Sequence, residues 1–191
     1  MIVFSYYRQF HILQHFRKID QKYMQRLVSE AGYAPGDIQN KLSTPSSKFW
    51  YGFAHNPQEL WSLLQQHLPP EENWNWEDNR CSHVITFNPQ TYPKGVGFDS
   101  LIDLEQLTPD EKKALACRQK NGYTVYILYS SKLIPTWQIN VISFYQENPD
   151  ITTIFPGKFA PPLPDPEYQD QVKYQESKKF WDRHAFVEIS R

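Results

Sequence analysis

Cysteine is nearly absent from this chain, since only two of its 191 residues are cysteines. Cys81 and Cys117 form no CxxC pair, and two thiols provide no disulfide framework. We therefore expect free, buried thiols, with a single Cys81–Cys117 bridge as the alternative. Glycine is also scarce, with seven residues against fifteen prolines, which favours rigid turns over flexible linkers.

Long hydrophobic runs and an excess of one charge are missing as well. No apolar run approaches the roughly 18 residues of a membrane span, and Arg8 and Arg17 interrupt the apolar N-terminal segment, which has no cleavable signal pattern. We therefore expect a cytoplasmic protein without membrane association. The net charge of −1 provides no global field toward nucleic acid, so such a role would need a local basic patch.

Aromatic side chains are the feature that the chain has in excess. They make up 16% of the residues, with six Trp, twelve Tyr and twelve Phe. Such residues bury large areas in a core, but they also line clefts and interfaces. The length is sufficient for one domain with a hydrophobic core.

The first eighty residues have the apolar period of helices. Apolar residues recur every three or four positions between 10 and 27 and indicate one continuous helical face. Asn56 is followed by Pro57 and then by Glu59, which predicts an N-capped helix that ends at Pro69. Further along, Thr108-Pro109-Asp110-Glu111 is a capping box and predicts another helix to about residue 120.

Strand signals dominate the rest of the chain. Segments 82–87, 123–130, 137–145 and 151–155 are rich in β-branched and aromatic residues. Asn121-Gly122 is the strongest turn signal, and Asp165-Pro166 opens a predicted helix over 165–184, followed by an edge strand over 185–189. The sequence thus predicts an α+β fold with N-terminal helices, a four- to five-stranded antiparallel sheet and a C-terminal helix. Its parts are 1–80, 81–164 and 165–191, within one compact domain.

Motifs for the common catalytic and cofactor sites are missing. His11 and His15 share a helix face, but there is no HExxH and no adjacent acid, so we expect neither a metal nor a cofactor. The spacing in "PKGVG" (93–97) is that of neither the P-loop nor the dinucleotide fingerprint. Cys81 and His83 share a strand face, but no third group orients them as a nucleophilic pair.

Polar residues on the predicted sheet suit metal-independent RNA cleavage. That reaction needs a base, an acid and a donor that stabilises the phosphorane. Histidine suits the first two roles, lysine and threonine suit the third, and exposed tryptophan stacks unpaired bases. Structural roles also explain these residue types, because strands favour threonine and loop lysines are usually only solvated. The candidate residues are His83, Lys94, Thr152, Thr153, Trp137 and Lys158.

The segments "SHVI", "PKGVG", "TVYIL", "WQINVI" and "ITTIFPG" together resemble the C-terminal half of the barnase–EndoU–colicin–RelE-like ribonuclease superfamily. EndoU-type and phage-associated toxins are the closest in layout, and the similarity spans about residues 82–157. It implies a toxin-like endoribonuclease that cleaves single-stranded or loop RNA without a cofactor and leaves a 2′,3′-cyclic phosphate. The chain departs from the EndoU pattern because its Gly-rich loop carries Lys94 where a second histidine is expected.

The resemblance also implies roles for individual residues. His83 would be the general base or acid, Lys94 the phosphate contact and Thr153 the hydroxyl donor, with Gly95 and Gly97 in the substrate loop. Strict alternation along the last strand places Thr152 and Thr153 on opposite faces, so only one of them can belong to a site.

A non-enzymatic protein-binding module, such as an immunity protein, antitoxin or regulatory adaptor, is the alternative. The acidic and aromatic loop 71–80 and the Pro-rich segment 158–171 motivate it, because Trp and Tyr are common interface anchors. Its partner would be a protein rather than RNA. A small-molecule pocket lined by aromatic residues is the third candidate.

Overall fold

A computed structural model of the chain contains both α-helices and antiparallel strands, so the predicted α+β class is confirmed. It divides into two compact units: Met1–Asp99 with Pro135–Gly157, and Ser100–Ile134 with Lys158–Arg191. In the part of the chain that is described, no helix has the length and apolar character needed to cross a membrane. The described residues are 2, 4–44, 46–77, 79–99, 103, 105, 108–109, 115–120, 123–128, 134–145, 147, 149–161, 170–184 and 189–190.

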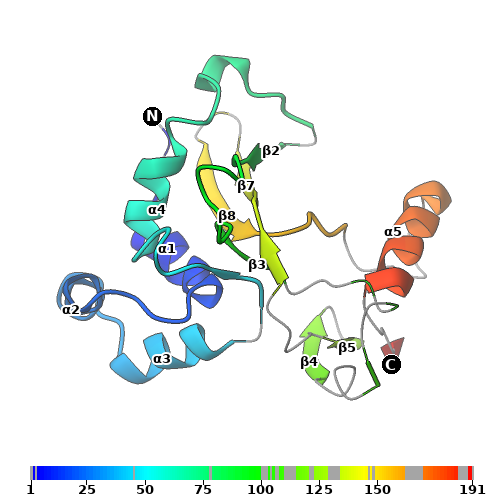
Figure 1. The fold of residues 1–191 in the computed structure, drawn as a ribbon, viewed down its shortest axis with the longest axis horizontal. Coiled ribbons are helices and arrows are strands. Elements are labelled where there is room, and N and C mark those ends of the chain that lie inside the picture. The colour runs from blue at the N-terminus through cyan, green and yellow to red at the C-terminus, as the bar shows by residue number, and fades with distance from the viewer. Residues whose placement is uncertain are drawn as a thin grey trace. The chain divides into compact units, whose positions relative to one another are not determined.

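Helices form the N-terminal part of the first unit (Figure 1). They are α1 (Tyr6–Ile12), α2 (Gln21–Ser29), α3 (Pro35–Ser43) and α4 (Pro57–Leu64), with single 3-10 turns η1 (Leu13–His15) and η2 (Glu71–Asn73).

Side-chain caps determine where three of these helices begin, namely α1 at Ser5, α2 at Asp20 and α4 at Asn56. Asp20 accepts a hydrogen bond from the backbone N–H of Tyr23 at 2.9 Å, and Asn56 accepts one from Glu59 at 2.9 Å. The predicted Asn56 cap is therefore confirmed. The helical face predicted over 10–27 is divided among α1, η1 and α2, because Phe16 has extended backbone and ends the first helical segment.

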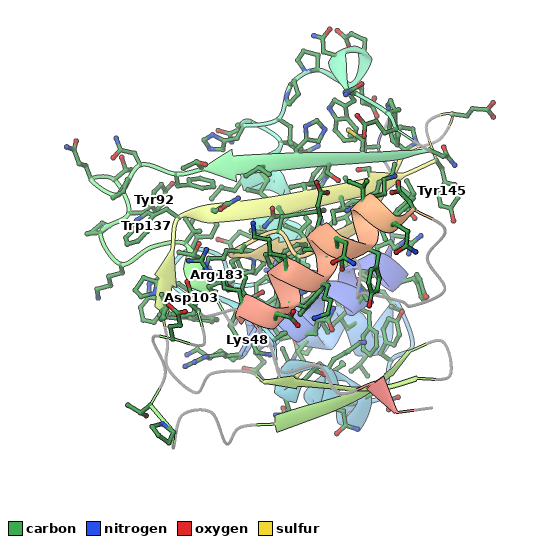
Figure 2. All side chains as sticks on the ribbon, turned by 90° about the vertical axis from the view of Figure 1, so that its right-hand side faces the viewer. Lys48, Tyr92, Asp103, Trp137, Tyr145 and Arg183 are labelled. Carbon is green, nitrogen blue, oxygen red and sulfur yellow. The ribbon has the colours of Figure 1, made fainter. Side chains whose placement is uncertain are left out.

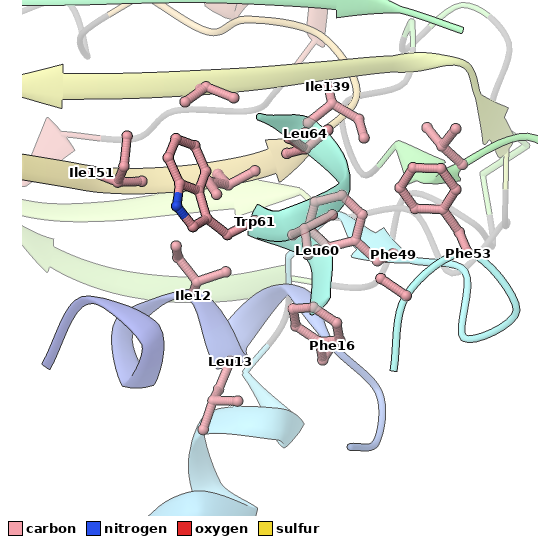
Figure 3. Packing of buried hydrophobic residues seen from close by; sticks show 14 of the residues in the cluster. Ile12, Leu13, Phe16, Phe49, Phe53, Leu60, Trp61, Leu64, Ile139 and Ile151 are labelled. Atoms are coloured by element: carbon pink, nitrogen blue, oxygen red, sulfur yellow. The ribbon is translucent and has the colours of Figure 1, made fainter. Parts of the chain in front are cut away.

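The central sheet of the first unit has the order β2-β7-β8 and is antiparallel. Its strands are β2 (Arg80–Thr86), β7 (Gln138–Phe144) and β8 (Asp150–Pro156). One face carries Ile139 and Ile151 and packs against Ile12, Leu60 and Leu64 of the helices, all with no exposed surface (Figure 3). We call it the helix-covered face, and the other side of the sheet the second face.

A β-bulge interrupts β8. Ser143 of β7 pairs with Ile151 and Ile142 pairs with Thr153, so Thr152 is the extra residue. The bulge allows Ile151 and Ile154 both to be fully buried although they are three residues apart. The strict alternation predicted for Thr152 and Thr153 therefore does not hold, because it requires an unbroken ladder.

A smaller sheet has the order β1-β3-β6, with β1 (Lys48–Phe49), β3 (Gly97–Asp99) and β6 (Ile134–Thr136). Its strands approach very closely at two glycines. A Cβ on Gly97 would lie 2.6 Å from the Lys48 carbonyl oxygen, and Gly95 has φ +78° with the Thr136 carbonyl oxygen 2.7 Å from its Cβ position. Both glycines are required by the backbone itself.

The second unit contains a hairpin of β4 (Leu115–Lys120) and β5 (Tyr123–Leu128), with β9 (Ile189–Ser190) paired to β5. The helix predicted to about residue 120 is therefore wrong over 115–120. Pairing with β5 prevails over the local helix signal at Thr108, because tertiary context overrides propensity. Residues 110–114 and the Asn121-Gly122 turn lie outside the described residues.

Helix α5 (Gln171–His184) confirms a C-terminal helix, and Asp170 caps it by accepting from the N–H groups of Val172 and Lys173. The predicted opening at Asp165-Pro166 lies outside the described residues. Over the described residues the strands form three separate three-stranded sheets, so the prediction of a single sheet of four or five strands is wrong. Residues 123–128 were predicted to belong to the same sheet as 137–145 and 151–155, but they pair with β4 instead.

Candidate functional site

His83 lies on the helix-covered face of the central sheet, because it pairs with Val141, which is fully buried in the core. Its ring packs 4.6 Å from the Trp74 ring, and its Nε2 is 3.1 Å from the Cys81 sulfur. Burial lowers the pKa of His83, so the neutral imidazole is favoured. This environment is that of a half-buried packing residue.

Cys81 and His83 do share a strand face, as predicted. The Cys81 side chain is only 2% exposed, and burial raises the pKa of its thiol. A catalytic Cys–His pair needs the thiolate and the imidazolium, whereas burial here favours the neutral form of both groups. The contact is therefore a structural hydrogen bond between neutral partners.

Thr153 lies on the second face of the central sheet, whereas His83 lies on the helix-covered face. The ladder pairs Thr153 with Ile142 and Ile142 with Ser82, and it pairs His83 with Val141, the next residue of β7. Directly paired residues share a face, and successive residues of a strand point to opposite faces. His83 and Thr153 are thus not brought together in one site.

The remaining predicted residues also separate. Trp137 donates its indole N–H to the Tyr92 carbonyl oxygen at 2.7 Å, and the two residues lie at the end of β7 away from Tyr145 (Figure 2). This hydrogen bond holds Tyr92 of the 88–96 loop against the start of β7, so Trp137 has a structural role. Lys158 is an exposed residue of the second unit.

Lys94 belongs to a different group, which we call the basic–aromatic row: Arg17, Phe98, Trp50 and Lys94. The Lys94 ammonium lies 5.7 Å from the centre of the Trp50 ring, which meets Phe98 edge-to-face at 6.0 Å. The Arg17 guanidinium lies 5.5 Å from the centre of the Phe98 ring. Two cations therefore flank two neighbouring rings.

Strand pairing explains why the row is at the surface. Lys48 pairs with Phe98 across β1 and β3, and the Trp50 N–H continues the pairing by donating to the Val96 carbonyl. Alternation places Phe49 inward, with 2% exposure, and leaves Trp50 on the other face with 38% exposure. Arg17 and Lys94 are both exposed.

A second cation–aromatic contact adjoins the row in sequence. The Lys18 ammonium lies 4.0 Å from the centre of the Tyr51 ring, and the Tyr51 ring meets His55 edge-to-face at 4.7 Å. A Glu59 carboxylate oxygen accepts a hydrogen bond from the His55 ring at 2.9 Å, so this second contact has an acidic neighbour. Three exposed cations therefore contact aromatic rings contributed by residues 50, 51 and 98.

A mixed-charge cleft of about 700 Å³ is present in the second unit. Its Arg183 pairs with Asp103 at 2.7 Å (Figure 2), and Lys178 pairs with Asp182. The hydrogen bond from Arg183 lowers the pKa of Asp103. These ions already neutralise one another, so the cleft has no single charge that would select a ligand. Its lining is Asp103, Glu105, Gln175, Lys178, Lys179, Asp182 and Arg183.

His15 of the His11–His15 pair and Trp74 of the acidic loop both have structural roles. The His15 ring is buried, with Nδ1 2.9 Å from the Ser47 carbonyl, and no group of three metal-binding side chains exists among the described residues. In the loop 71–80, Trp74 is 6% exposed and donates to the Pro69 carbonyl. Trp74 is thus a core residue rather than an interface anchor.

Comparisons of the chain with models of protein families, with curated proteins and with solved structures find no match. The basic–aromatic row is therefore the feature of the described residues that points to a function. Sequence reasoning singled out Lys94 but missed Arg17, Trp50 and Phe98. The available signal was the run "KFWYG" (48–52), in which Trp50 alternates with a core phenylalanine.

Proposed function

We propose that the protein binds single-stranded nucleic acid, with RNA as the first candidate, through the basic–aromatic row. The observation that carries the proposal is the contiguous order of Arg17, Phe98, Trp50 and Lys94. Proteins that bind single strands combine cations for the phosphates with rings on which bases stack. The row has both groups on one exposed surface.

Isolated cation–aromatic contacts would not justify this proposal. They occur about once per 70–80 residues, so a few are expected in any chain of this length. The row differs because its two cations sit on two rings that also touch each other. A base stacked on Trp50 would have an ammonium group within reach of its phosphate.

The central test measures the affinity of a fluorescently labelled oligouridylate by anisotropy. Trp50→Ala should weaken binding by about 1–3 kcal/mol, which is about 5- to 150-fold, because one stacking surface is lost. Tyr7→Ala is the matched control, since Tyr7 is 67% exposed and carries the Arg8 guanidinium 5.4 Å from its ring centre. Equal weakening by both variants, or no binding by the parent protein, would refute the proposal.

Two further arms of the same experiment define the ligand. Lys94→Gln should weaken binding and reduce its salt dependence, whereas Lys22→Gln on the exposed side of α2 should change neither. With two or three phosphates neutralised, affinity should fall about 7- to 20-fold between 50 and 200 mM salt. The DNA oligonucleotide of the same sequence separates recognition of RNA from recognition of any single strand.

A further inference from the structure

The strand β2 forms an outer edge of the central sheet, because the order is β2-β7-β8. The N–H of Phe87 donates to the Trp137 carbonyl of the neighbouring strand, and the N–H and C=O of Arg80 both bond to Glu77 on the other side. Alternation then directs the backbone groups of Ser82, Val84 and Thr86 outward. None of these groups has a backbone partner among the described residues.

The side chains of this edge do not protect it from pairing. Ser82, Val84 and Thr86 are exposed, with Val84 at 54%. Natural sheets usually block a free edge with lysine, proline, a charge or a bulge. From Cys81 to Thr86 the strand has no lysine, no proline and no other charged residue, and its ladder with β7 contains no bulge. Such a strand is suited to accept another strand.

Symmetry selects the partner and the register. In an antiparallel pair of two identical strands centred on Val84, Val84 lies opposite itself and Ser82 lies opposite Thr86. The outward N–H and C=O groups of these three residues are then all satisfied by the same groups of the second copy. A register centred on His83 would place Thr86 opposite Arg80, whose backbone groups are already bonded to Glu77.

We propose that the protein forms a two-fold dimer in which β2 pairs antiparallel with β2 of a second copy, with Val84 at the axis. The contact is isologous, so it closes after two copies and does not propagate into a filament. It opposes no like charges, because Ser82, Val84 and Thr86 are uncharged. The inference goes beyond the proposed nucleic-acid binding and does not depend on it.

Cysteine cross-linking tests the register directly. In a Cys117→Ser background, Val84→Cys should give a disulfide-linked dimer under mild oxidation. Opposed residues of a hydrogen-bonded antiparallel pair have Cα atoms about 5.5 Å apart, within the range of a disulfide. Ser82→Cys alone should not cross-link, since its copy lies four residues away, about 13 Å. An equal mixture of Ser82→Cys and Thr86→Cys chains should form the mixed dimer.

Sedimentation over a range of concentrations tests the dimer without cysteines. Val84→Lys should shift the protein to monomer, because two ammonium groups would meet at the axis. Val172→Lys, at a position of α5 that is 68% exposed, adds the same charge elsewhere and should leave the dimer unchanged. Circular dichroism shows that each variant is folded. A parent protein that is monomeric throughout, or Ser82→Cys that cross-links as well as Val84→Cys, would overturn the proposal.

Discussion

At the scale of single residues, Gly157 is held in a conformation that other residues rarely adopt. Its φ is +103°, and a Cβ there would lie 2.8 Å from the Cγ and one carboxylate oxygen of Asp99. Its carbonyl accepts from the Asn140 side-chain amide at 2.7 Å, and Asn140 is buried. The Gly157 backbone is therefore held between the Asp99 carboxylate and the Asn140 amide, just after β8 ends.

Gly157→Ala should lower the free energy of unfolding by about 1–3 kcal/mol, because it adds backbone strain and a close contact with Asp99. Gly36→Ala is the matched control. Gly36 lies in α3 with open space around its Cβ position, so the same substitution should raise stability by up to about 1 kcal/mol. Urea unfolding measures both values, and similar effects of the two substitutions would contradict the assigned role of Gly157.

Residue types and local spacing predicted some of these positions but not their grouping. The Asn56 cap follows from three neighbouring residues, and it is where the sequence placed it. The separation of His83 from Thr153 depends on which residues of β7 they pair with, and the bulge at Thr152 breaks the alternation that the sequence suggests. Neither feature has a local signal, because both arise from long-range pairing.

At the scale of elements, Lys48 joins the ends of two helical segments. Its ammonium donates to the carbonyls of Leu42 and Thr44 at the end of α3, at 2.9 and 2.8 Å. It also donates to the Gln14 carbonyl of η1 at 2.5 Å. A cation at helix C-termini is favoured by the exposed carbonyl groups there. Burial, and then the charge of Arg17, nevertheless lower the pKa of Lys48 to about 8.

The lowered pKa gives a stability difference with a defined sign. Between about pH 8 and about pH 10.4 the unfolded chain holds a proton on Lys48 that the folded chain has lost, so the contribution of Lys48 to stability rises with pH. Relative to Lys48→Met, the parent protein should therefore gain about 1 kcal/mol of unfolding free energy per pH unit in this window.

Urea unfolding of both proteins at pH 7, 8, 9 and 10 measures this gain. Lys22→Met, which removes an exposed lysine of α2, corrects for the general effect of charge. Parallel stability curves for the parent protein and Lys48→Met would mean that the carbonyl partners of Lys48 keep its ammonium group charged throughout.

Elements were predicted best where their signals are local. The helix that begins at Pro57 is α4, although α4 ends at Leu64 and not at Pro69, and the strands predicted over 82–87, 137–145 and 151–155 overlap β2, β7 and β8. The capping box at Thr108 misled because residues 115–120 gain a hairpin partner, and a cross-strand ladder provides hydrogen bonds that an isolated helix signal cannot anticipate. The basic–aromatic row was missed because Arg17, Trp50 and Phe98 come from three distant segments.

At the scale of the whole molecule, charge is locally concentrated although the net value is −1. The cations Arg17, Lys18 and Lys94 lie over aromatic rings in the first unit, whereas the cleft of the second unit contains paired ions. A protein with no net positive charge can bind nucleic acid only through a local basic patch, and the basic–aromatic row is such a patch. Binding and cleavage are then separable questions, because they depend on different residues.

The separation of binding from cleavage predicts the behaviour of His83→Ala. His83 packs against Trp74 and Cys81 on the helix-covered face, away from Thr153, so the substitution should leave oligouridylate affinity unchanged. Incubation of tRNA with the purified protein in EDTA should give no His83-dependent product. A 2′,3′-cyclic phosphate end produced by the parent protein and absent with His83→Ala would instead support the toxin-like ribonuclease. In that case the acid, base and phosphate contact would have to be sought around His83, because Thr153 faces the opposite side of the sheet.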